Sequence, residues 1–419
     1  MKILVFNAGS STHKSCVYDL TETLPSLHPP QPIWESLIDW THQPGSEQIN
    51  ATVKIETWQG EEHPPLVFQA EISSNHRSDL IEQVLSHLWQ GKAPALESPS
   101  DLAIAGHRVV HGGQKYHTSM LVDAEVKQAI ADLAIFAPVH NPANLEGIIA
   151  VENILGNCIP QVAVFDTAFH AQMPAAAAIY PIPYEFYEQG IRRYGFHGIS
   201  HQYVAQRTAE ILGRDLASLK LVTCHLGNGC SLAAIQNGYS IDTTMGFTPL
   251  AGLMMGSRSG DIDPSILLYL MQEKGYTSAQ LDDLLNRSSG LLGVSGISND
   301  MRQIVAAIAD GNERAQLAYD IYIHRLRSLI GSMVAVLGGM DALVFTAGVG
   351  ENAACVRADV CSAFGFLGVA IDPEQNSNRP IDCDIALSDS RVRVLVVHTR
   401  EEWAIAQACW RMARDRGEN

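Results

Sequence analysis

The chain has 419 residues, of which 46% are hydrophobic and 17% charged, and its formal net charge is −17 at pH 7. This length is enough for two or three domains, and the composition is that of a folded globular chain rather than a disordered one. Nucleic acid and anionic membranes attract basic surfaces, so we expect neither as a partner, although a small pocket can still be locally basic.

The eight cysteines are scattered and form no Cys-x-x-Cys pair. Several lie in apolar runs, so we predict reduced core residues in a cytoplasmic protein. The first residues run directly into a predicted strand, and no signal peptide is expected. The long apolar stretch 329–348 contains Asp341 and a Gly-Gly pair, which predict a helix end, a turn and a buried strand rather than a membrane span.

The segment 3–20, "ILVFNAGSSTHKSCVYDL", predicts a β-hairpin with an unusual turn. A hairpin turn needs only one Gly or Asn, whereas this one carries Asn7, two serines and Lys14 around Gly9. Backbone N–H groups, hydroxyls and an ammonium suit a bound phosphate. The alternative is an ordinary polar turn with a solvated lysine.

The following segments alternate between strand and helix patterns. Residues 25–65 are rich in Pro and polar groups and predict exposed connections between short strands, and 77–90 has helical apolar spacing. A strand is predicted in "LAIAGHRVVHGG", two helices flank "APVHNP", and a buried strand ends at "FDTAFH". This alternation is typical of the α/β class.

The second half repeats the opening pattern. Residues 220–244 predict another hairpin around "HLGNG", and "ALVFTAGVGEN" (342–352) is a strand followed by glycines and a helix. Two such bends predict two related domains. The third segment also matches a dinucleotide fingerprint, with Asp372 downstream, so an NAD(P) enzyme is an alternative. A nucleotide-binding turn at a helix N-terminus is more economical, because two phosphate-type turns precede it.

Three charged residues lie where catalytic groups are expected. Arg108 and Arg258 lie in Gly-rich segments, and Asp166 ends a hydrophobic strand. Surface ion pairs would explain either arginine alone. Two guanidinium groups in such loops better fit a substrate pair of carboxylate and phosphate, which they bind through bidentate contacts.

The segment "YGFHGISH" places His197 and His201 at an i,i+4 spacing, but Gly198 occupies the place of the glutamate that a zinc motif requires. These histidines are either core residues or groups that hold a phosphoryl. Glu401 and Glu402 begin a predicted helix, where acids either complement the helix dipole or ligate magnesium.

Together these motifs resemble those of the acetate kinase family, within the acetate and sugar kinase, heat-shock protein and actin superfamily. The matching segments follow the family's order: "NAGSSTHK", "GHRVVHGG", "HNPANL", "FDTAFH", "RRYGFHGISH", "HLGNG", "MGSRSGDIDP", "SNDMR", "GVGEN" and "TREE". The resemblance implies two related actin-like (ribonuclease H-like) α/β domains with an inter-domain active-site cleft. The first would comprise 1–168 with 402–419, and the second, nucleotide-binding domain 169–401.

The resemblance also implies an activity: reversible transfer of the ATP γ-phosphoryl group to acetate, giving acetyl phosphate and ADP, with Mg²⁺ or Mn²⁺, in a homodimer. In-line transfer of this kind depends on positioning, positive charge and exclusion of water. Asp166 would be the catalytic acid/base, Arg258 would steady the migrating phosphoryl, His197 would stabilise the transition state, and Arg108 would bind the carboxylate.

The remaining implied site residues fall into three groups. The metal would be organised by Asn7 and Glu401. The acyl pocket would be lined by Val110, Val139, Phe196 and Pro249. ATP or ADP would be bound by Lys14, by His225, Leu226, Gly227, Asn228 and Gly229, by Asp300, Met301 and Arg302, and by Gly348, Val349, Gly350, Glu351 and Asn352.

The chain departs from the family pattern at three positions. Val139 stands where Leu is usual, Ala251 where Glu is common, and Arg400 where Asn is common. A smaller residue at 139 leaves room for one methylene, so we predict that propionate is accepted with little loss. A propionate or butyrate kinase of the same fold is therefore an alternative. A non-catalytic ATP-binding module of the actin or chaperone kind is another, but it has no use for two arginines and a histidine.

Overall fold

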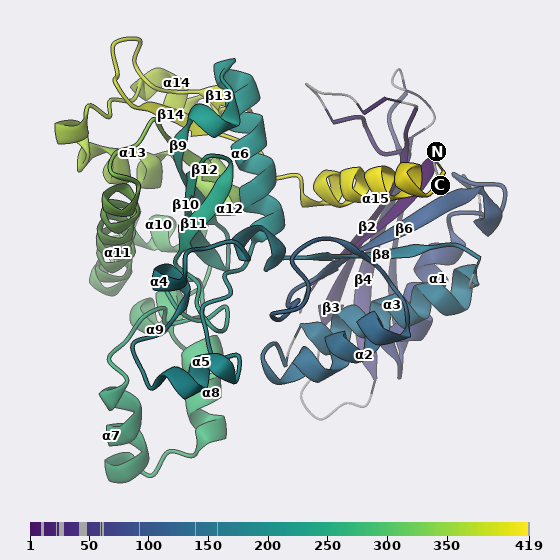
Figure 1. The fold of residues 1–419 in the computed structure, drawn as a ribbon, viewed down its shortest axis with the longest axis horizontal. Helices are drawn as coiled ribbons and strands as arrows, with labels where there is room; N and C mark the ends of the chain where they lie inside the picture. Colours follow the sequence, from purple (N-terminus) through teal and green to yellow (C-terminus); the bar gives the residue numbers. More distant parts are fainter. Residues whose placement is uncertain are drawn as a thin grey trace. The chain divides into compact units, whose positions relative to one another are not determined.

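The computed structural model describes residues 1–9, 12–21, 23–24, 29–41, 48–58, 60, 63–91, 93–138, 140–156 and 158–417. The chain forms two compact units (Figure 1). Unit 1 comprises Met1–Ala168 and Arg400–Asn419, and unit 2 comprises Phe169–Thr399. Each unit contains one sheet with helices, so the predicted α/β class is confirmed.

In the described part of unit 1 the sheet has the strand order β5-β4-β3-β2-β1-β6-β8-β7. Strands β1, β6 and β8 run parallel, and the others pair antiparallel to their neighbours. The strands are β1 (Lys2–Ala8), β2 (Thr12–Asp19), β3 (Trp34–Thr41), β4 (Ile49–Thr57), β5 (Leu66–Ser74), β6 (Leu102–Val109), β7 (Met120–Leu121) and β8 (Gln161–Phe165). The predicted opening hairpin is confirmed as β1 and β2; Ser10 and Ser11 of its turn lie outside the described residues.

Helices cover both faces of the unit 1 sheet. They are α1 (Arg77–Ser86), α2 (Ala124–Asp132), α3 (Asn141–Leu155) and α15 (Glu401–Gly417), with short 3₁₀ turns at Pro99–Asp101 and Leu133–Ile135. Successive side chains of a strand point to opposite faces. Leu4 and Phe6 of β1 accordingly join the core formed with α1 and α3, whereas Asn7 points to the face that carries α15.

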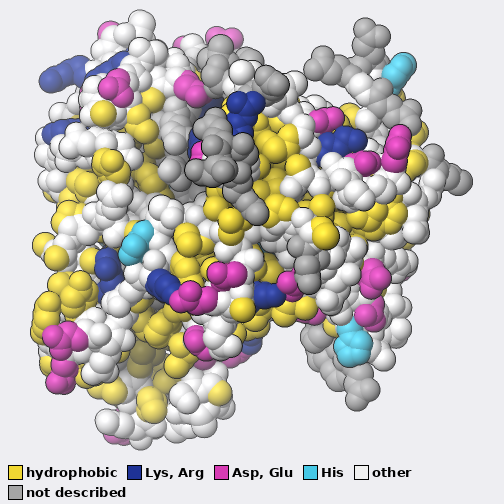
Figure 2. Space-filling model, turned by 45° about the vertical axis from the view of Figure 1, so that its right-hand side comes forward, with side chains coloured by type: hydrophobic (Ala, Val, Ile, Leu, Met, Phe, Trp, Pro, Cys, Tyr) yellow, Lys and Arg dark blue, Asp and Glu magenta, His cyan; other side chains and the backbone are white. Residues whose placement is uncertain are grey.

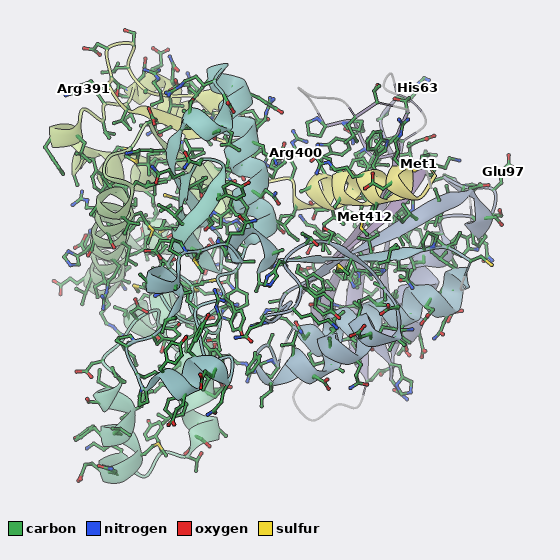
Figure 3. All side chains as sticks on the ribbon, viewed as in Figure 1. Met1, His63, Glu97, Arg391, Arg400 and Met412 are labelled. Carbon is green, nitrogen blue, oxygen red and sulfur yellow. The ribbon has the colours of Figure 1, made fainter. Side chains whose placement is uncertain are left out.

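Helix α15 packs very closely on β1 and β6. A Cβ atom at Gly106 of β6 would lie 2.3 Å from Cys409 Sγ and 2.7 Å from a methyl carbon of Ile405, so only glycine permits this approach. Trp403 is also buried. Figure 3 labels Arg400 at the start of this helix and Met412 near its end, where Met1 also lies. The close contact fixes the first turn of α15, which carries Glu401 and Glu402, against the sheet.

In the described part of unit 2 the sheet has the order β11-β10-β9-β12-β14-β13. Its strands are β9 (Lys220–Leu226), β10 (Cys230–Gln236), β11 (Tyr239–Thr243), β12 (Ala342–Thr346), β13 (Cys383–Asp384) and β14 (Arg393–Val396). Its helices are α4 (Ala175–Ala178), α5 (Tyr184–Glu188), α6 (Gly198–Leu212), α7 (Ser265–Lys274), α8 (Ser278–Arg287), α9 (Gly290–Ser295), α10 (Met301–Ala309), α11 (Glu313–Leu337), α12 (Ala347–Asn352), α13 (Ala354–Ser362) and α14 (Pro373–Ser377).

The two sheets share one topology. In each, a hairpin of two antiparallel strands is extended on one side by a third antiparallel strand. On the other side, the first strand of the hairpin pairs in parallel with a later strand, and that strand pairs in parallel with a further one. Strands β3-β2-β1-β6-β8 of unit 1 thus correspond in order to β11-β10-β9-β12-β14 of unit 2. The predicted repeat is therefore confirmed at the level of strand order. The mixed sheet of unit 2 does not support the dinucleotide-fold alternative, which calls for a mostly parallel doubly wound sheet.

Two further sequence predictions concern the apolar segments. The stretch 329–348 contains the end of α11, a turn and the buried strand β12, as predicted, and no helix in the described parts of the chain is long and apolar enough to cross a membrane. The cysteines are free, and five of them are buried. On the face shown in Figure 2, basic side chains are interspersed with acidic ones.

Four buried histidines make stability depend on pH. Burial is the main cause that lowers their pKa: to about 3 for His13, to about 4 for His107 and His170, and well below 6.5 for His201. These groups are neutral in the folded protein but take up protons when it unfolds below about pH 6.5. Their contribution to stability is thus complete above pH 6.5 and is lost as the pH falls.

We expect His170→Gln to flatten this dependence. Between pH 6.5 and 4, the wild type should lose about 1.4 kcal/mol more unfolding free energy per pH unit than the variant, because His170 binds a proton only when unfolded. Denaturant titrations at pH 7, 6 and 5 measure the difference. Parallel curves for the two proteins would contradict the assignment of His170 as a buried neutral group.

Candidate active site

The candidate residues of unit 1 gather at one edge of its sheet. The parallel strands β1, β6 and β8 end next to one another, and ligands of open α/β sheets bind beyond such carboxyl ends. Asn7 and Arg108 lie near the ends of β1 and β6, and Asp166 directly follows β8, where its N–H donates to the carbonyl of Val109 at 2.9 Å.

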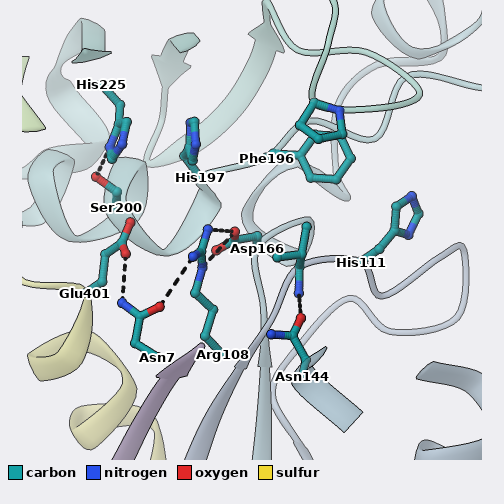
Figure 4. Close-up of polar contacts among 12 residues, drawn as sticks. Asn7, Arg108, His111, Asn144, Asp166, Phe196, His197, Ser200, His225 and Glu401 are labelled. Atoms are coloured by element: carbon teal, nitrogen blue, oxygen red, sulfur yellow. Dashed lines mark hydrogen bonds and ion pairs between the residues drawn. The ribbon is translucent and has the colours of Figure 1, made fainter. Parts of the chain in front are cut away.

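Arg108 and Asp166 form a buried ion pair (Figure 4). Arg108 Nε and Nη2 both donate to Asp166 Oδ2, at 3.0 and 2.6 Å, while Nη1 donates to Asn7 Oδ1 at 3.3 Å. Asp166 is fully buried, and its Oδ1 has no hydrogen-bond partner among the described residues. One carboxylate oxygen thus orients the guanidinium, and the other is buried without a hydrogen bond.

The electrostatics of this pair follow from its burial. Burial raises the pKa of Asp166 to about 6, although the Arg108 guanidinium acts in the opposite direction. For Arg108, burial lowers the pKa, but the carboxylates of Asp166, Glu401 and Glu402 outweigh that effect and raise it above its usual value. The guanidinium therefore stays charged, and the pKa of the carboxyl group lies above its ordinary value.

Asn7 joins the ion pair to the first turn of α15. Its Nδ2 donates to Glu401 Oε2 at 3.2 Å and to Glu402 Oε1 at 3.1 Å. Lys14 of β2 pairs in register with Asn7, so its exposed side chain lies on the same face of the sheet. The predicted metal residues Asn7 and Glu401 are thus brought together, with Lys14 on the neighbouring strand.

Two asparagines hold the loop that follows β6. Asn144 Oδ1 accepts from the N–H of Val110 at 3.1 Å, and Asn144 Nδ2 donates to the carbonyl of Ala8 at 3.1 Å. Asn141 Oδ1 accepts from the N–H of His111 at 3.1 Å. Both asparagines are buried. Val110 is also buried, whereas Val139, predicted for the same acyl pocket, lies outside the described residues.

In unit 2, the hairpin turn between β9 and β10 is the centre of the candidate site. His225 is the penultimate residue of β9 and lies at the register position of Thr346 in the parallel strand β12. The N–H of Gly227 donates to the carbonyl of Gly229 at 3.0 Å, which closes the turn. His225 Nδ1 lies 2.8 Å from Ser200 Oγ, whose hydroxyl is 3.0 Å from Thr399 Oγ1.

Arg258 and His197 both approach Gly229. A Cβ atom there would lie 3.4 Å from Cε1 and Nε2 of His197 and 3.5 Å from Nη1 of Arg258. The His197 ring stacks on that of His225, with centroids 4.2 Å apart and planes at 20°. The structure thus brings the predicted phosphoryl-binding residues of unit 2 together beside Gly229, a position of the turn that has no side chain.

The backbone of His197 is in the left-handed region, with φ 54° and ψ 25°, at the N-cap of α6. Residues other than Gly rarely adopt this conformation, and it is typical of sites where function requires it. The preceding Phe196 is buried, and its predicted place in an acyl pocket stays a prediction. Pro249 is partly exposed, and its carbonyl accepts from Arg258 Nη1 at 3.0 Å, which orients the guanidinium.

Asn228, at the tip of the turn, is held by two other segments. Its carbonyl accepts from the N–H of Gly256 at 3.0 Å, and its Oδ1 accepts from Asn299 Nδ2 at 3.3 Å. Asp300 follows directly and caps α10 by accepting from the N–H of Arg302 at 2.9 Å. The predicted nucleotide residues at 225–229 and 300–302 are thus neighbours, with Met301 buried beneath them.

The last predicted nucleotide segment, 348–352, forms the short helix α12 after a left-handed Ala347 with φ 64°. Gly348 is exposed and Gly350 is buried. The Glu351 carboxylate accepts from the N–H groups of Ala347 at 2.8 Å and Thr399 at 3.0 Å. In this structure Glu351 therefore links α12 to the segment after β14 and supports the loop. Its predicted contact with nucleotide stays a prediction.

Comparison with known proteins decides the family. The model of the Acetokinase family matches residues 2–407. This chain belongs to the acetokinase family. It is 59% identical over 419 residues to the acetate kinase of Cyanothece sp. (strain PCC 7425) and 60% identical over 414 residues to that of Gloeobacter violaceus, with 99% or more of each chain covered.

Solved structures of the family share the fold. The acetate kinase of Porphyromonas gingivalis superimposes with a TM-score of 0.85 at 39% identity, covering 98% of this chain and 99% of the other. A propionate kinase from Francisella tularensis gives a TM-score of 0.85 at 38% identity, covering 97% and 98%. The actin-like fold class that the resemblance implied is thereby confirmed.

The donor set around Asn7 fits the magnesium ion that the acetokinase family implies. Mg²⁺ takes oxygen ligands and is commonly bound by one or two carboxylates with several retained waters. Glu401 and Glu402 supply carboxylate oxygens of this kind, and both accept from the amide nitrogen of Asn7, while the amide oxygen of Asn7 accepts from Arg108. No cluster of three or more His, Cys, Asp or Glu side chains suited to a metal is found in the described parts of the chain.

Several supporting residues were missing from the sequence prediction. These are Asn141, Asn144, Ser200, Thr223, Ser231 and Thr399. The asparagines left a usable signal: they are three residues apart at the start of a helix, so both face the same side. The hydroxyl residues left none, because small polar side chains in strands are common.

Proposed function

We propose that this protein transfers the γ-phosphoryl group of ATP to acetate, reversibly and with Mg²⁺, giving acetyl phosphate and ADP. The observation that carries the proposal is its full-length identity with acetate kinases at 59–60%. The ion pair at the strand ends of unit 1 and the grouping of Arg258 and His197 around Gly229 in unit 2 support it.

Residues of unit 1 prepare the acceptor. Arg108 keeps its charge and is fixed by Asp166 Oδ2 and Asn7 Oδ1, so its guanidinium offers donors in a set orientation to a small carboxylate. The unpartnered Asp166 Oδ1 is the atom that can accept or return a proton. Buried Val110 supplies apolar surface for the methyl group.

Residues of unit 2 stabilise the phosphoryl group. In phosphoryl transfer, charge is spread over the equatorial oxygens, so fixed donors at that position lower the barrier. Arg258 supplies a permanent positive charge and His197 Nε2 a donor, and the main chain of the Gly227–Gly229 turn leaves room for the phosphates. Asp300–Arg302 and Gly348–Asn352 bind the rest of the nucleotide in this proposal.

Mg²⁺, or Mn²⁺ in its place, would be held by Glu401 and Asn7 with Glu402 beside them. When bound, the ion supplies charge neutralisation for the phosphate oxygens. This edge of the unit 1 sheet combines positive and negative side chains. The charges of Arg108 and Lys14 offset those of the α15 carboxylates.

Acyl hydroxamate formation tests the proposal directly. The purified chain is incubated with ATP, Mg²⁺, hydroxylamine and either acetate, propionate or butyrate, and acyl phosphate is trapped as hydroxamate. Acetate-dependent product with stoichiometric ADP is expected. ATP hydrolysis that is independent of the carboxylate would instead favour a non-catalytic module of the actin or chaperone kind.

A propionate kinase is the second candidate, favoured by the equal TM-score of the Francisella tularensis enzyme. Val139 bears on this choice. We expect Val139→Leu to lower kcat/KM for propionate relative to acetate by about 10-fold, since one methylene in an apolar pocket is worth roughly 1–3 kcal/mol. Steady-state kinetics with both acids measure the ratio, and an unchanged ratio would remove residue 139 from the acyl pocket.

We also propose that the protein is a homodimer, using the surface around α7. None of the residues of α7 is buried, although the helix and its flanks carry a group of exposed apolar side chains. These are Ile262, Ile266, Leu268, Tyr269, Met271 and Tyr276. A group of apolar side chains exposed on one helix is typical of a surface that binds another protein. A second copy of the chain fits because family members are expected to be dimers.

Leu268→Glu should therefore convert a dimer into a monomer. The wild type is expected at twice the chain mass of 45.6 kDa in light scattering coupled to size exclusion, and the variant at the chain mass itself. Leu317→Glu, on another exposed site of unit 2, is the matched control and should remain dimeric. A monomeric wild type, or a dimeric Leu268 variant, would contradict the proposal.

A further inference from the structure

A chain of hydrogen bonds runs from the interior of unit 2 to the ring of His197. Thr223 Oγ1 of β9 lies 2.7 Å from His201 Nδ1, and His201 Nε2 lies 2.8 Å from Ser231 Oγ of β10. Ser231 Oγ in turn lies 2.8 Å from His197 Nδ1. Thr223, His201 and Ser231 are completely buried. None of them belongs to the residues assigned above to substrate or metal.

His201 carries a single ring proton. It is fully buried, and burial, with the neighbouring His170 and His225, lowers its pKa well below 6.5. A neutral imidazole donates through one nitrogen and accepts through the other. One of its two hydroxyl partners must therefore donate to it, and the other must accept from it.

Thr223 decides which way the chain runs. Among the described residues its hydroxyl has no hydrogen-bond partner besides His201 Nδ1. If it accepted there, its own O–H would be a buried donor without an acceptor, which costs about 1–3 kcal/mol. If it donates to Nδ1, every group is satisfied: His201 Nε2–H donates to Ser231 Oγ, and the Ser231 hydroxyl donates to His197 Nδ1.

We propose that Thr223, His201 and Ser231 act as positioning residues that hold His197 as the neutral Nε2–H tautomer. Because Nδ1 accepts from Ser231, the single ring proton of His197 is on Nε2, the nitrogen that approaches Gly229. His197 then donates a hydrogen bond to the phosphoryl group without first being protonated. This inference rests on the role given to His197 in the proposed function.

The other groups that face His197 within unit 2 act in the same direction. His225 stacks on its ring, and Arg258 Nη1 shares its approach to Gly229. The guanidinium carries a permanent positive charge, so a neutral His197 ring avoids like-charge repulsion beside it. A proton on His197 Nδ1 would leave one buried hydroxyl without an acceptor: that of Ser231 if Ser231 accepted from both histidines, or that of Thr223 if all three hydrogen bonds reversed.

The tautomer is measurable in the protein without substrate. The full chain is labelled with ¹⁵N-histidine, and long-range ¹H–¹⁵N correlation spectra are recorded at neutral pH, with the His197 signals assigned by their loss in His197→Gln. A pyrrole-type Nε2 and a pyridine-type Nδ1 are expected. A protonated Nδ1, alone or on an imidazolium, would overturn the inference.

Thr223 offers a matched pair of variants at the far end of the chain. Thr223→Val keeps the shape but removes the hydroxyl, whereas Thr223→Ser keeps the hydroxyl. In the valine variant we expect both tautomers of His197 and a fall in kcat of roughly 3- to 10-fold with an unchanged KM for ATP, as one lost hydrogen bond allows. The serine variant should keep the single tautomer and kcat within about twofold.

Ser231→Ala gives an independent check next to His197. The same change of tautomer is expected, and if this variant fails to fold, the Thr223 pair still decides. An unchanged His197 tautomer in Thr223→Val would refute the chain. The spectra do not depend on catalysis, so a protein with the expected tautomer but no acetate-dependent turnover would refute the proposed function alone.

Discussion

Arg258→Ala is expected to lower kcat for acetyl phosphate formation by about 10³- to 10⁵-fold, the range found when an arginine that neutralises a transferring phosphoryl group is absent. The guanidinium is oriented by the carbonyl of Pro249 and lies beside the Gly229 turn together with His197. Alanine removes the charge, whereas the hydrogen bond that closes the turn joins the backbone of Gly227 and Gly229 and does not involve Arg258. The dissociation constant for ATP, measured by calorimetry, should change much less than kcat.

Two further variants sharpen this test. Arg258→Lys keeps a positive charge but loses the planar fork, so its kcat should lie between those of the wild type and the alanine variant. Arg287→Ala removes an exposed arginine of α8 that pairs with Asp283, and it should leave kcat unchanged. An Arg258→Ala protein that turns over within tenfold of the wild type would contradict the role given to this residue.

Asp166→Asn is expected to lower kcat by about 10²- to 10⁴-fold, as the loss of a general acid/base does. The carboxylate uses only Oδ2 to orient Arg108, and the other oxygen is buried without a partner. Asparagine can still accept from Arg108, but it cannot exchange a proton. Because the guanidinium keeps its place, we expect KM for acetate to change by less than about threefold.

Arg108→Lys should show the opposite split between the two kinetic constants. Lysine keeps the charge but loses the bidentate geometry that suits a carboxylate, so KM for acetate should rise more than kcat falls. If Asp166→Asn raised KM and left kcat within threefold, Asp166 would act only by holding Arg108, and its assignment as acid/base would be wrong.

The sequence was most informative where local chemistry sets local structure. Apolar runs around "NAGSSTHK" and "HLGNG" predict both hairpins, because apolar strands and Gly-rich turns are local properties of the sequence. The recurrence of this hairpin pattern in the second half predicts that the two sheets share a strand order. Arg108, Asp166 and Asn7 could be predicted as chemical groups. Their joining by hydrogen bonds depends on which strands become neighbours, which no local pattern states.

The supporting residues could not be predicted for the same reason. Ser231 and Thr223 look like ordinary strand residues, and their roles arise only because α6 places His201 against β9 and β10. Glu351 illustrates the converse: it lies in a nucleotide-type motif, yet its carboxylate accepts from the backbone at 347 and 399. A motif gives the position of a side chain in the sequence, whereas its partners depend on the tertiary fold.

The return of the chain to unit 1 at Arg400 has a consequence for biosynthesis. Helix α15 covers one face of β1 and β6, with Trp403, Ile405 and Cys409 buried against it. During translation, residues 169–399 are all synthesised before this helix. Until then, one face of the unit 1 sheet is not covered by α15. The core on that face of unit 1 can therefore be completed only after the whole chain has been synthesised.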